Sequence, residues 1–380
     1  MEQRCGSLEG MVMNWSGKHV LLTGHTGFKG SWLSLWLQQK GAELCGIALE
    51  PSTKVNLFQD AGVEREMRSV IGDIRDASLL RQTFAEHRPE IVLHLAAQPL
   101  VRTSYEDPIG TYSTNVMGTA NVLEAARHTD SVRAIVVVTT DKCYENREWE
   151  WPYRETDRLG GYDPYSNSKA CAELVVSAYR NSFFNPKNYA SHGVAVASVR
   201  AGNVVGGGDW AEDRLVPDVI RAFMEARPVR IRNPRAIRPW QHVMEPLRGY
   251  LAVAESMCDQ GAASGDAWNF GPEQSDAQPV GWIVDELAKL WGNGAQWEKE
   301  GAAQPHEAQT LKLDWSKAAA RLGWHPLLTL RDALALTVIW YQKRLQDEDM
   351  HAFTRAQIEQ YEGRWLSNST TNPKSGGVHA

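Results

Sequence analysis

The sequence predicts an α/β fold, a Rossmann-type doubly wound parallel sheet with a smaller, partly interleaved substrate domain in the C-terminal half. Residues 18–23 (KHVLLT) form an unbroken apolar run, as expected of a strand that is buried on both faces of a parallel sheet. The run ends in a glycine-rich turn, GHTGFKG, which leads into the apolar, helix-like segment SWLSLWLQQ. Strand-like and helix-like segments then alternate along the chain, which is the pattern of a doubly wound sheet.

The expected elements follow in chain order. Apolar runs predict strands at residues 18–23, 44–49, 91–95, 134–138 and 194–199, and longer patterns predict helices at 31–39, 118–127 and 168–179. Beyond residue 206, loops rich in Gly, Pro and Trp surround helices expected at 216–225, 244–257 and 280–291. We therefore predict an N-terminal extension (1–13), a mainly dinucleotide-binding domain (14–205), a mainly substrate-binding domain interleaved with it (206–345), and a C-terminal helix and flexible tail (346–380). The polar tail begins near Ser367.

The composition is that of an ordinary folded protein. Of the 380 residues, 43% are hydrophobic and 23% are charged, which argues against disorder, collagen and small disulfide scaffolds. The net charge of −6, without a dense basic run, argues against a dedicated nucleic-acid binder. The five cysteines lack metal-type spacing, and no apolar run suits a membrane helix or a signal peptide. We therefore expect a cytoplasmic protein with reduced thiols, without a metal site, and with neither membrane nor nucleic acid as a partner.

The glycine-rich turn has the spacing of a dinucleotide-binding loop. Gly24 permits the tight turn, Gly27 lets the backbone approach a pyrophosphate, and Gly30 permits close packing of the helix. The helix that follows presents unpaired N–H groups and partial positive charge to phosphate. The loop residues expected to bind the cofactor are Gly24, Thr26, Gly27, Phe28, Lys29 and Gly30.

Two later segments fit the same ligand. The Asp73 carboxylate, followed by Ile74, can accept a hydrogen bond from an adenine amino group. Ala96 and Ala97 end the strand expected at 91–95, and their small side chains let a flat cofactor lie against the backbone. Each segment alone also suits an ordinary turn or strand end, but their order along the chain supports a cofactor site.

The second strand bears on which dinucleotide is bound. Ala48 occupies the position where NAD-binding folds usually carry the acid that holds the adenosine ribose, and Glu50 follows two residues later. No arginine for a 2′-phosphate is evident nearby. The sequence therefore favours NAD over NADP, although it does not identify the acidic residue that would bind the adenosine ribose.

Two groups of residues suggest the reacting centre. Tyr165 and Lys169 stand four residues apart, hence on one face of a helix, where an ammonium favours the phenolate that can remove a hydroxyl proton. Thr140, Asp141 and Lys142 follow the strand expected at 134–138, at the edge where open α/β sheets bind ligands. An adjacent carboxyl and amine there suggest an acid and a base, although an ion pair on a solvated loop has the same sequence.

Together these motifs resemble the extended short-chain dehydrogenase/reductase family over residues 15–341, and within it the nucleotide-sugar 4,6-dehydratases. Family members carry Thr-Asp-Glu where this chain has Thr140-Asp141-Lys142. That lysine and the strings GHTGFKGSWLSLWL, HLAAQPLVRTSY, TTDKCYEN and RPWQHV most resemble the group that acts on CDP-glucose.

The resemblance implies a cycle in which NAD is reduced and then regenerated. Tyr165, helped by Lys169 and the Thr140 hydroxyl, takes the proton from the sugar 4-hydroxyl as hydride passes from carbon 4 to NAD. The resulting ketone acidifies the proton on carbon 5, so that a base removes it while an acid protonates the departing 6-hydroxyl. Asp141 matches the acid; Lys142 matches the base, and either removes this proton or stabilises the enolate, since an ordinary lysine is protonated at neutral pH.

The resemblance also implies where the substrate lies. Asn203 in VRAGNVVG matches an asparagine that contacts the substrate, and Arg238 in RPWQHV matches the arginine that pairs with the diphosphate. The remaining substrate candidates are Gln98 in HLAAQPL, Leu215 and Pro217 in DRLVPD, and His306.

The expected activity is that of a lyase, which converts CDP-glucose into CDP-4-keto-6-deoxyglucose and water in deoxysugar biosynthesis for surface polysaccharide such as lipopolysaccharide O-antigen. We expect a homodimer or homotetramer, paired through the helices expected at 118–127 and 168–179. The alternatives are a dehydratase for another nucleotide sugar, a nucleotide-sugar 4-epimerase, and a regulatory protein that binds NAD without catalysis. The residues alone do not identify the nucleotide base.

Overall fold

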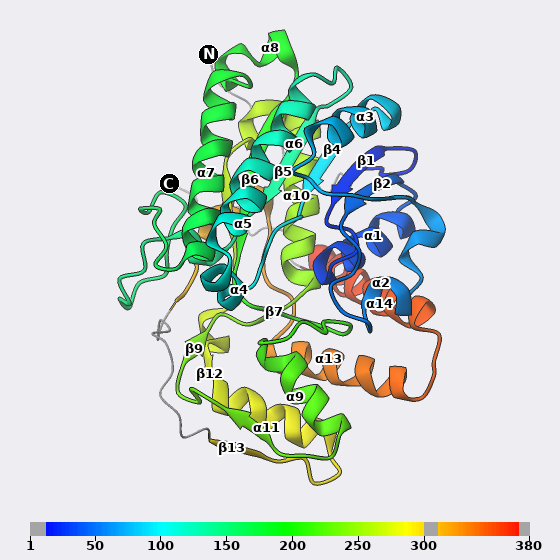
Figure 1. Ribbon diagram of the computed structural model, residues 1–380, viewed down its shortest axis with the longest axis vertical. Helices are drawn as coiled ribbons and strands as arrows, with labels where there is room; N and C mark the ends of the chain where they lie inside the picture. Colours follow the sequence, from blue (N-terminus) through cyan, green and yellow to red (C-terminus); the bar gives the residue numbers. More distant parts are fainter. Residues whose placement is uncertain (1–12, 300–310, 372–380) are drawn as a thin grey trace.

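A parallel sheet forms the centre of the protein (Figure 1). The computed structural model describes residues 13–299 and 311–371, and within these ranges seven strands pair in the order β11-β6-β5-β4-β1-β2-β3. Their bounds are β1 His19–Thr23, β2 Glu43–Ala48, β3 Arg68–Ile71, β4 Ile91–His94, β5 Ala134–Val138, β6 Ala195–Ala201 and β11 Ala267–Phe270. β1 pairs with both β2 and β4, so the strand order reverses beside β1, where ligands of such sheets bind. The predicted Rossmann-type fold is confirmed.

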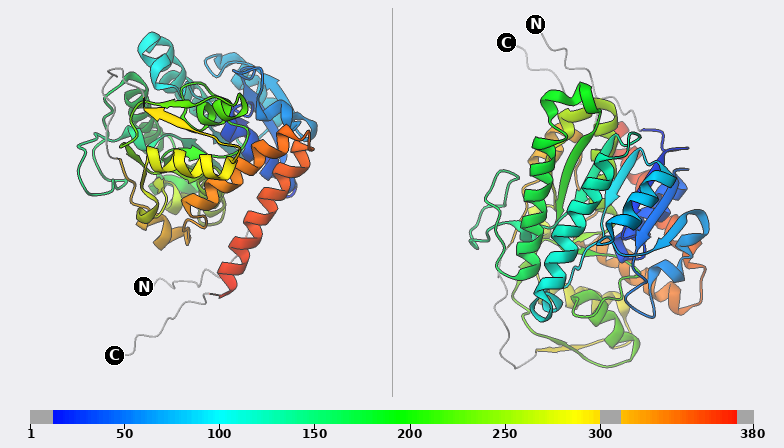
Figure 2. Two further views of the ribbon diagram at one scale, coloured as in Figure 1. Left: turned by 90° about the horizontal axis from the view of Figure 1, so that it is seen from below. Right: turned by 45° about the horizontal axis from the view of Figure 1, so that its top comes forward.

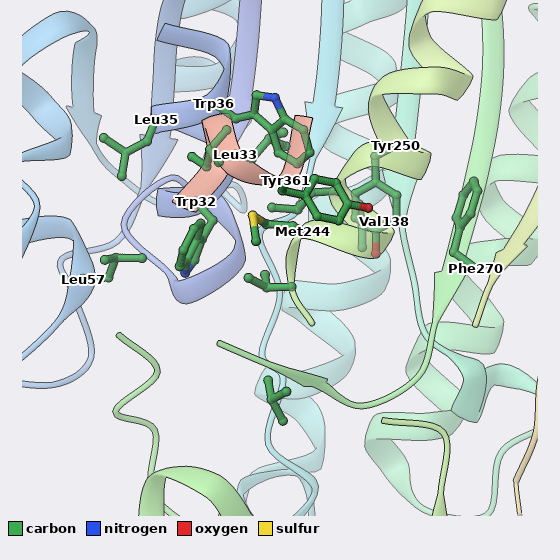
Figure 3. Close-up of a cluster of buried hydrophobic side chains, with 14 of the residues drawn as sticks. Trp32, Leu33, Leu35, Trp36, Leu57, Val138, Met244, Tyr250, Phe270 and Tyr361 are labelled. Carbon is green, nitrogen blue, oxygen red and sulfur yellow. The ribbon is translucent and has the colours of Figure 1, made fainter. Parts of the chain in front are cut away.

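Helices cover both faces of this sheet, which is why strands in its middle, such as β1, β4 and β5, are apolar without alternation. Val20 and Leu22 of β1 face a core shared with α1 (Phe28–Gln39) and α10 (Met244–Gln260). Leu21 faces the opposite core, which is shared with α3 (Ala77–His87), α6 (Gly118–Arg127) and α7 (Pro164–Ser182). Figure 3 shows the first core, where aromatic side chains of α1 and α10 meet Phe270 of β11 and Tyr361 near the C-terminus.

The C-terminal half contributes to both parts of the protein. β11 is an edge strand of the central sheet, and α10 packs against β5 and β6. A smaller body below it in Figure 1 holds α9 (Leu215–Met224), α11 (Val280–Trp291) and the short strands β8 (Val229–Ile231), β9 (Ile237–Arg238), β12 (Gln278–Pro279) and β13 (Trp297–Lys299). The domain boundaries given above remain a prediction.

Two helices close the chain. α13 (Leu330–Leu345) leads into α14 (Met350–Thr371), which lies along α1. The Trp36 indole N–H donates to the Glu362 carboxylate at 2.8 Å, and the Trp36 ring meets that of Tyr361 edge to face. The far end of α14 stands away from the protein in the left view of Figure 2. The helix continues to Thr371, so it includes the first residues of the predicted tail, whose flexibility stays a prediction, and the residues after 371 lie outside the described ranges.

The remaining described α-helices and strands are short. They are α2 (Leu57–Asp60), α4 (Val101–Glu106), α5 (Pro108–Tyr112), α8 (Tyr189–His192), α12 (Ser316–Leu322), β7 (Val204–Val205) and β10 (Gln241–His242). None of the helices in residues 13–299 and 311–371 is long and apolar enough to cross a membrane. The same residues contain no cluster of three or more His, Cys, Asp or Glu side chains arranged to hold a metal ion. The predicted extension at 1–13 lies almost entirely outside the described residues.

Several elements differ from their sequence-based prediction. α7 begins at Pro164 rather than at 168, because the Asp163 carboxylate caps it by accepting from the Ser166 backbone N–H at 2.9 Å. β3 was not predicted as a strand: it is an edge strand whose residues are exposed or half-buried, so it lacks an apolar run. β11 was also missed because it lies in the loop-rich half of the sequence.

Candidate active site

The glycine-rich turn joins β1 to α1 and is shaped for close backbone approach. Gly24 has a φ of +82°, and a Cβ placed there would lie 2.8 Å from the Ala96 backbone nitrogen. A Cβ at Gly30 would lie 2.0 Å from the Gly24 carbonyl oxygen, so both positions exclude a side chain. Gly27 precedes the first turn of α1, which has neither a side-chain cap nor an acidic residue. These open N–H groups fit the pyrophosphate of a dinucleotide.

The neighbouring strand ends complete a binding edge for a dinucleotide. The Thr26 hydroxyl donates to the Leu49 carbonyl at 2.8 Å, which fixes the turn against the end of β2. The Ala96 N–H donates to the Thr23 hydroxyl at 3.1 Å, and the adjacent Ala97 is half-buried. Glu50 is exposed two residues beyond the buried Ala48, so a carboxylate is present near the expected ribose position.

The other predicted cofactor residues have visible structural contacts. Asp73 forms an ion pair with Arg75 at 2.6 Å, while Ile74 is buried and packs where α6 begins at Gly118. Phe28 lies near Gly206, since a Cβ at Gly206 would be 3.1 Å from its ring. For these three residues the structure shows contacts within the protein, and their binding of the cofactor remains a prediction.

Tyr165 and Lys169 lie on the first two turns of α7, and both are buried. The Lys169 ammonium donates to the Val138 carbonyl at 3.1 Å, which places it at the end of β5. Burial lowers the pKa of Lys169 to about 8. Burial raises the pKa of Tyr165 to about 12, against a hydrogen bond with Thr140 that lowers it. The predicted Thr140–Tyr165 contact is therefore present.

The Thr140-Asp141-Lys142 triplet begins at the end of β5, beside Tyr165. The Thr140 hydroxyl donates to one oxygen of the Asp141 carboxylate at 2.9 Å. The other oxygen, Oδ2, is buried without a hydrogen-bond partner among the described residues, and Asp141 is 2% exposed. Burial raises the pKa of Asp141, against the nearby positive charges of Lys142 and Arg238. A buried carboxyl with a raised pKa can hold and donate a proton.

Lys29 belongs to the glycine-rich turn, yet its amine lies on the side of the reacting centre. Its Nζ is 3.5 Å from the phenol oxygen of Tyr250 on α10. Burial lowers its pKa to about 8, with a further lowering by Arg214 that Asp141 opposes. The sequence did not single out Tyr250, because α10 follows the turn by more than two hundred residues.

Arg214 is a second residue that sequence reasoning missed. It precedes α9, and its guanidinium pairs with the Asp209 carboxylate at 2.9 Å. Its positive charge lowers the pKa of Tyr165, opposing the effect of burial. The string DRLVPD contains Arg214, but only the fold places this arginine beside Tyr165.

The predicted substrate residues are partly brought together. Arg238 is buried and lies within electrostatic range of Asp141, and Asn203 is half-buried after β6. Leu215 and Pro217 form the first turn of α9. The Gln98 side-chain amide donates to the Thr111 hydroxyl and the Leu100 carbonyl, so it stabilises the loop that follows β4. His306 lies outside the described residues.

A basic cavity of about 600 Å³ opens between α4, α9 and β8, and sequence reasoning did not predict it. Arg102 of α4 pairs with Asp213, which precedes α9, at 2.7 Å across this opening. The lining residues are Arg102, Asp218, Arg221, Arg227, Pro228, Val229, Arg230, Arg232 and Glu298. Each of the five arginines already pairs with a carboxylate: Arg102 and Arg232 with Asp213, Arg221 with Asp218, Arg227 with Glu225, and Arg230 with Glu298.

Comparison with known proteins agrees with this geometry. The family described as GDP-mannose 4,6 dehydratase matches residues 21–337. The chain belongs to this family. A CDP-glucose 4,6-dehydratase of Salmonella typhimurium strain LT2 is 56% identical over 347 residues, which cover 91% of this chain and 97% of that protein. The predicted membership of the nucleotide-sugar 4,6-dehydratases is therefore confirmed.

Solved structures of other proteins share the fold. A UDP-glucose 4-epimerase from Thermotoga maritima superposes with a TM-score of 0.73 at 23% identity, over 86% of this chain and 99% of that one. A dTDP-glucose 4,6-dehydratase from Streptomyces venezuelae with bound NAD gives 0.72 at 24% identity, over 87% and 98% of the two chains. At these identities the likeness supports the Rossmann-type architecture.

Proposed function

We propose that this protein converts CDP-glucose into CDP-4-keto-6-deoxyglucose and water with NAD as its cofactor. The 56% identity to a CDP-glucose 4,6-dehydratase over 91% of the chain carries this proposal. The paired Tyr165–Lys169 and Asp141–Lys142 side chains at one sheet edge support it, because the first pair suits oxidation and the second suits elimination. Bound NAD supplies the acceptor and donor of hydride. The glycine-rich turn and Ala96 would hold it.

Tyr165 would accept the proton of the sugar 4-hydroxyl as carbon 4 is oxidised. A phenol with a pKa near 12 is almost entirely protonated at neutral pH, so nearby positive charge must favour its ionised form. Arg214 and the Thr140 hydrogen bond both lower the pKa of Tyr165. Lys169, whose amine is fixed to the Val138 carbonyl, adds a cation on the same helix face.

Asp141 and Lys142 would then remove water from the 4-keto sugar. The ketone acidifies the proton on carbon 5, and Lys142 takes this proton or stabilises the enolate. Asp141 donates its proton to the 6-hydroxyl, which leaves as water. Burial raises the pKa of Asp141, which favours the protonated form that this step needs. Return of the hydride to carbon 6 and of a proton to carbon 5 would then complete the 6-deoxy sugar.

Replacing Lys142 by methionine tests this assignment. Lys142→Met keeps a long side chain but removes the amine, so we expect dehydration to fall by roughly 10²-fold or more. NAD binding should be unchanged, because Lys142 lies at the end of β5 rather than in the glycine-rich turn. The measurements are the alkaline enolate absorbance of the product and NAD affinity by calorimetry. The exposed Lys187→Met is the control, and near-wild-type turnover of Lys142→Met would falsify the role.

A substrate panel tests the overall proposal. CDP-, dTDP-, UDP- and GDP-hexoses are incubated with the protein, and we expect a 4-keto-6-deoxy sugar from CDP-glucose. A 4-epimerase, the second candidate, interconverts two hexoses without losing water; the presence of Asp141 and Lys142 favours dehydration. No turnover of any nucleotide sugar would instead support a regulatory protein that binds NAD.

We further propose that the protein works in the cytoplasm as a homodimer or homotetramer, within deoxysugar biosynthesis for surface polysaccharide such as O-antigen. Its four described cysteines are free thiols, which suits a reducing compartment. We also infer a mainly NAD-binding part at 14–205 and a mainly substrate-binding part at 206–345. The smaller body around α9 and α11 supports this division.

An apolar surface on α5, on the π-helical segment Ser113–Met117 that leads into α6, and on α7 supports pairing with a second copy. Ile109, Met117 and Leu174 are 77%, 56% and 59% exposed on these elements, which pack against one another. Leu174→Glu would place a charge in this surface, so we expect the dimer to dissociate into monomers by light scattering. Leu290→Glu on α11 is the control, since Leu290 is also exposed but lies in the smaller body. An unchanged mass for Leu174→Glu contradicts pairing through these helices.

A further inference from the structure

Glu173 is a buried carboxylate on α7, one helical turn beyond Lys169. It forms an ion pair with Arg200 of β6, and both side chains are 3% exposed. The Arg200 Nε and Nη2 donate to its two oxygens at 2.8 and 2.7 Å. The hydroxyl of Ser198 donates at 2.7 Å and that of Thr139 at 2.5 Å. Four donors therefore satisfy this carboxylate inside the protein, as a buried charge requires.

These bonds connect the elements that carry the reacting groups. Thr139 directly precedes the Thr140-Asp141-Lys142 triplet at the end of β5. Ser198 and Arg200 lie on β6, which leads to the substrate candidate Asn203. Because Glu173 shares α7 with Tyr165 and Lys169, its carboxylate fixes the helix of the oxidising pair to the strand that carries the eliminating pair.

Glu173 also supplies negative charge close to Lys169. Side chains four residues apart on a helix are neighbours, and the Glu173 carboxylate opposes the lowering of the Lys169 pKa by burial. The other charged or titratable groups facing Lys169 are Lys29 of α1, His94 of β4 and Cys143 after β5. Among these described groups Glu173 is the carboxylate that raises the pKa of Lys169, and it also forms the ion pair with Arg200.

We propose that Glu173 is a positioning residue for both half-reactions, which holds the Tyr165–Lys169 helix in register with the Thr140-Asp141-Lys142 triplet and balances the charge of Lys169. This inference rests on the proposed function. A purely structural ion pair would affect stability alone, whereas a positioning residue affects the chemical steps and their pH dependence.

Glu173→Gln is the principal test, because glutamine keeps the shape but removes the charge. We expect kcat to fall about 10²-fold, as for a small misplacement of reacting groups, with KM for CDP-glucose changed by less than about threefold. Without the carboxylate the pKa of Lys169 falls further, so Lys169 loses its proton at lower pH. The alkaline limb of the kcat profile should therefore move to lower pH.

Glu245→Gln is the matched control. Glu245 on α10 is equally buried and accepts from the Tyr361 hydroxyl at 2.8 Å and from the backbone N–H groups of Leu327 and Leu328 at 2.9 and 2.7 Å. None of these partners belongs to the strands that carry the reacting groups. We expect Glu245→Gln to lower the melting temperature without moving the pH profile. A Glu173→Gln variant that behaves in the same way overturns the proposal.

Thr139→Val provides a milder test if Glu173→Gln does not fold. Valine has nearly the same shape but cannot donate to Glu173 or to the Val199 carbonyl, while the Glu173 charge and its bonds to Arg200 and Ser198 remain. We expect kcat to fall about tenfold, equivalent to 1.4 kcal/mol, with an unchanged pH profile. A wild-type kcat for this variant also overturns the proposal. Wild-type protein is assayed in parallel: if it does not act on CDP-glucose, the proposed function fails, and the variants are compared on the hexose nucleotide that the panel identifies.

Discussion

Tyr165→Phe should lower kcat by about 10²–10⁴-fold, the range associated with loss of a general base. Phenylalanine keeps the ring, which is buried beside Thr140 and Arg214, but has no oxygen to accept the proton of the 4-hydroxyl. Oxidation of carbon 4 comes first, so the variant should produce neither a keto sugar nor water. Steady-state formation of the 4-keto-6-deoxy sugar measures the loss.

The control for this variant is Tyr162→Phe. Tyr162 lies three residues earlier, is 83% exposed, and loses the same oxygen atom on substitution. It should retain near-wild-type kcat, and both variants should bind NAD and unfold near the wild-type temperature. Equal turnover by Tyr165→Phe and the wild type would assign the proton transfer to another group.

Asp141→Asn should lower the rate of dehydration by about 10²–10⁴-fold without preventing the oxidation of carbon 4. Asparagine has the same shape and can still meet the Thr140 hydroxyl through its carbonyl, but it has no acidic proton for the departing 6-hydroxyl. Because Tyr165 and Lys169 are unchanged, the sugar can be oxidised without losing water. We expect the absorbance of reduced nicotinamide to rise in a single turnover while little product forms.

Asp130→Asn is the matched control for this experiment. Asp130 is exposed and precedes β5, so it lies near the opposite end of the strand that leads to Asp141. Its substitution should leave both oxidation and dehydration unchanged. Rapid product formation by Asp141→Asn, or failure to reduce the nicotinamide, would contradict the role of Asp141 as the acid of the elimination step alone.

The residues that lie close in sequence were the ones that could be predicted. Lys169 and Tyr165 are four residues apart, and Asp141 follows a strand whose bounds the apolar run AIVVV defines. Local spacing is enough in these cases, because a helix or a parallel strand fixes where its neighbours point.

Residues brought together by long-range packing could not be predicted in this way. Arg214 approaches Tyr165 only because α9 lies below the sheet edge, and Tyr250 meets Lys29 only because α10 covers β5 and β6. Glu173 falls on an apolar helix pattern, and nothing in the sequence shows that Arg200 pairs with it. A single sequence carries the periodicity of each element but not the contacts between distant elements.

The position of β11 has a consequence for synthesis of the protein on the ribosome. β11 borders β6, and α10 covers the face of β5 and β6, yet both are translated after residue 243. In a nascent chain that ends near residue 205, one edge of β6 would be unpaired and the apolar face of β5 and β6 would be exposed to water. Both features favour aggregation. We therefore expect residues 1–205 expressed alone to aggregate, because the strand and the helix that cover β6 come from later in the chain.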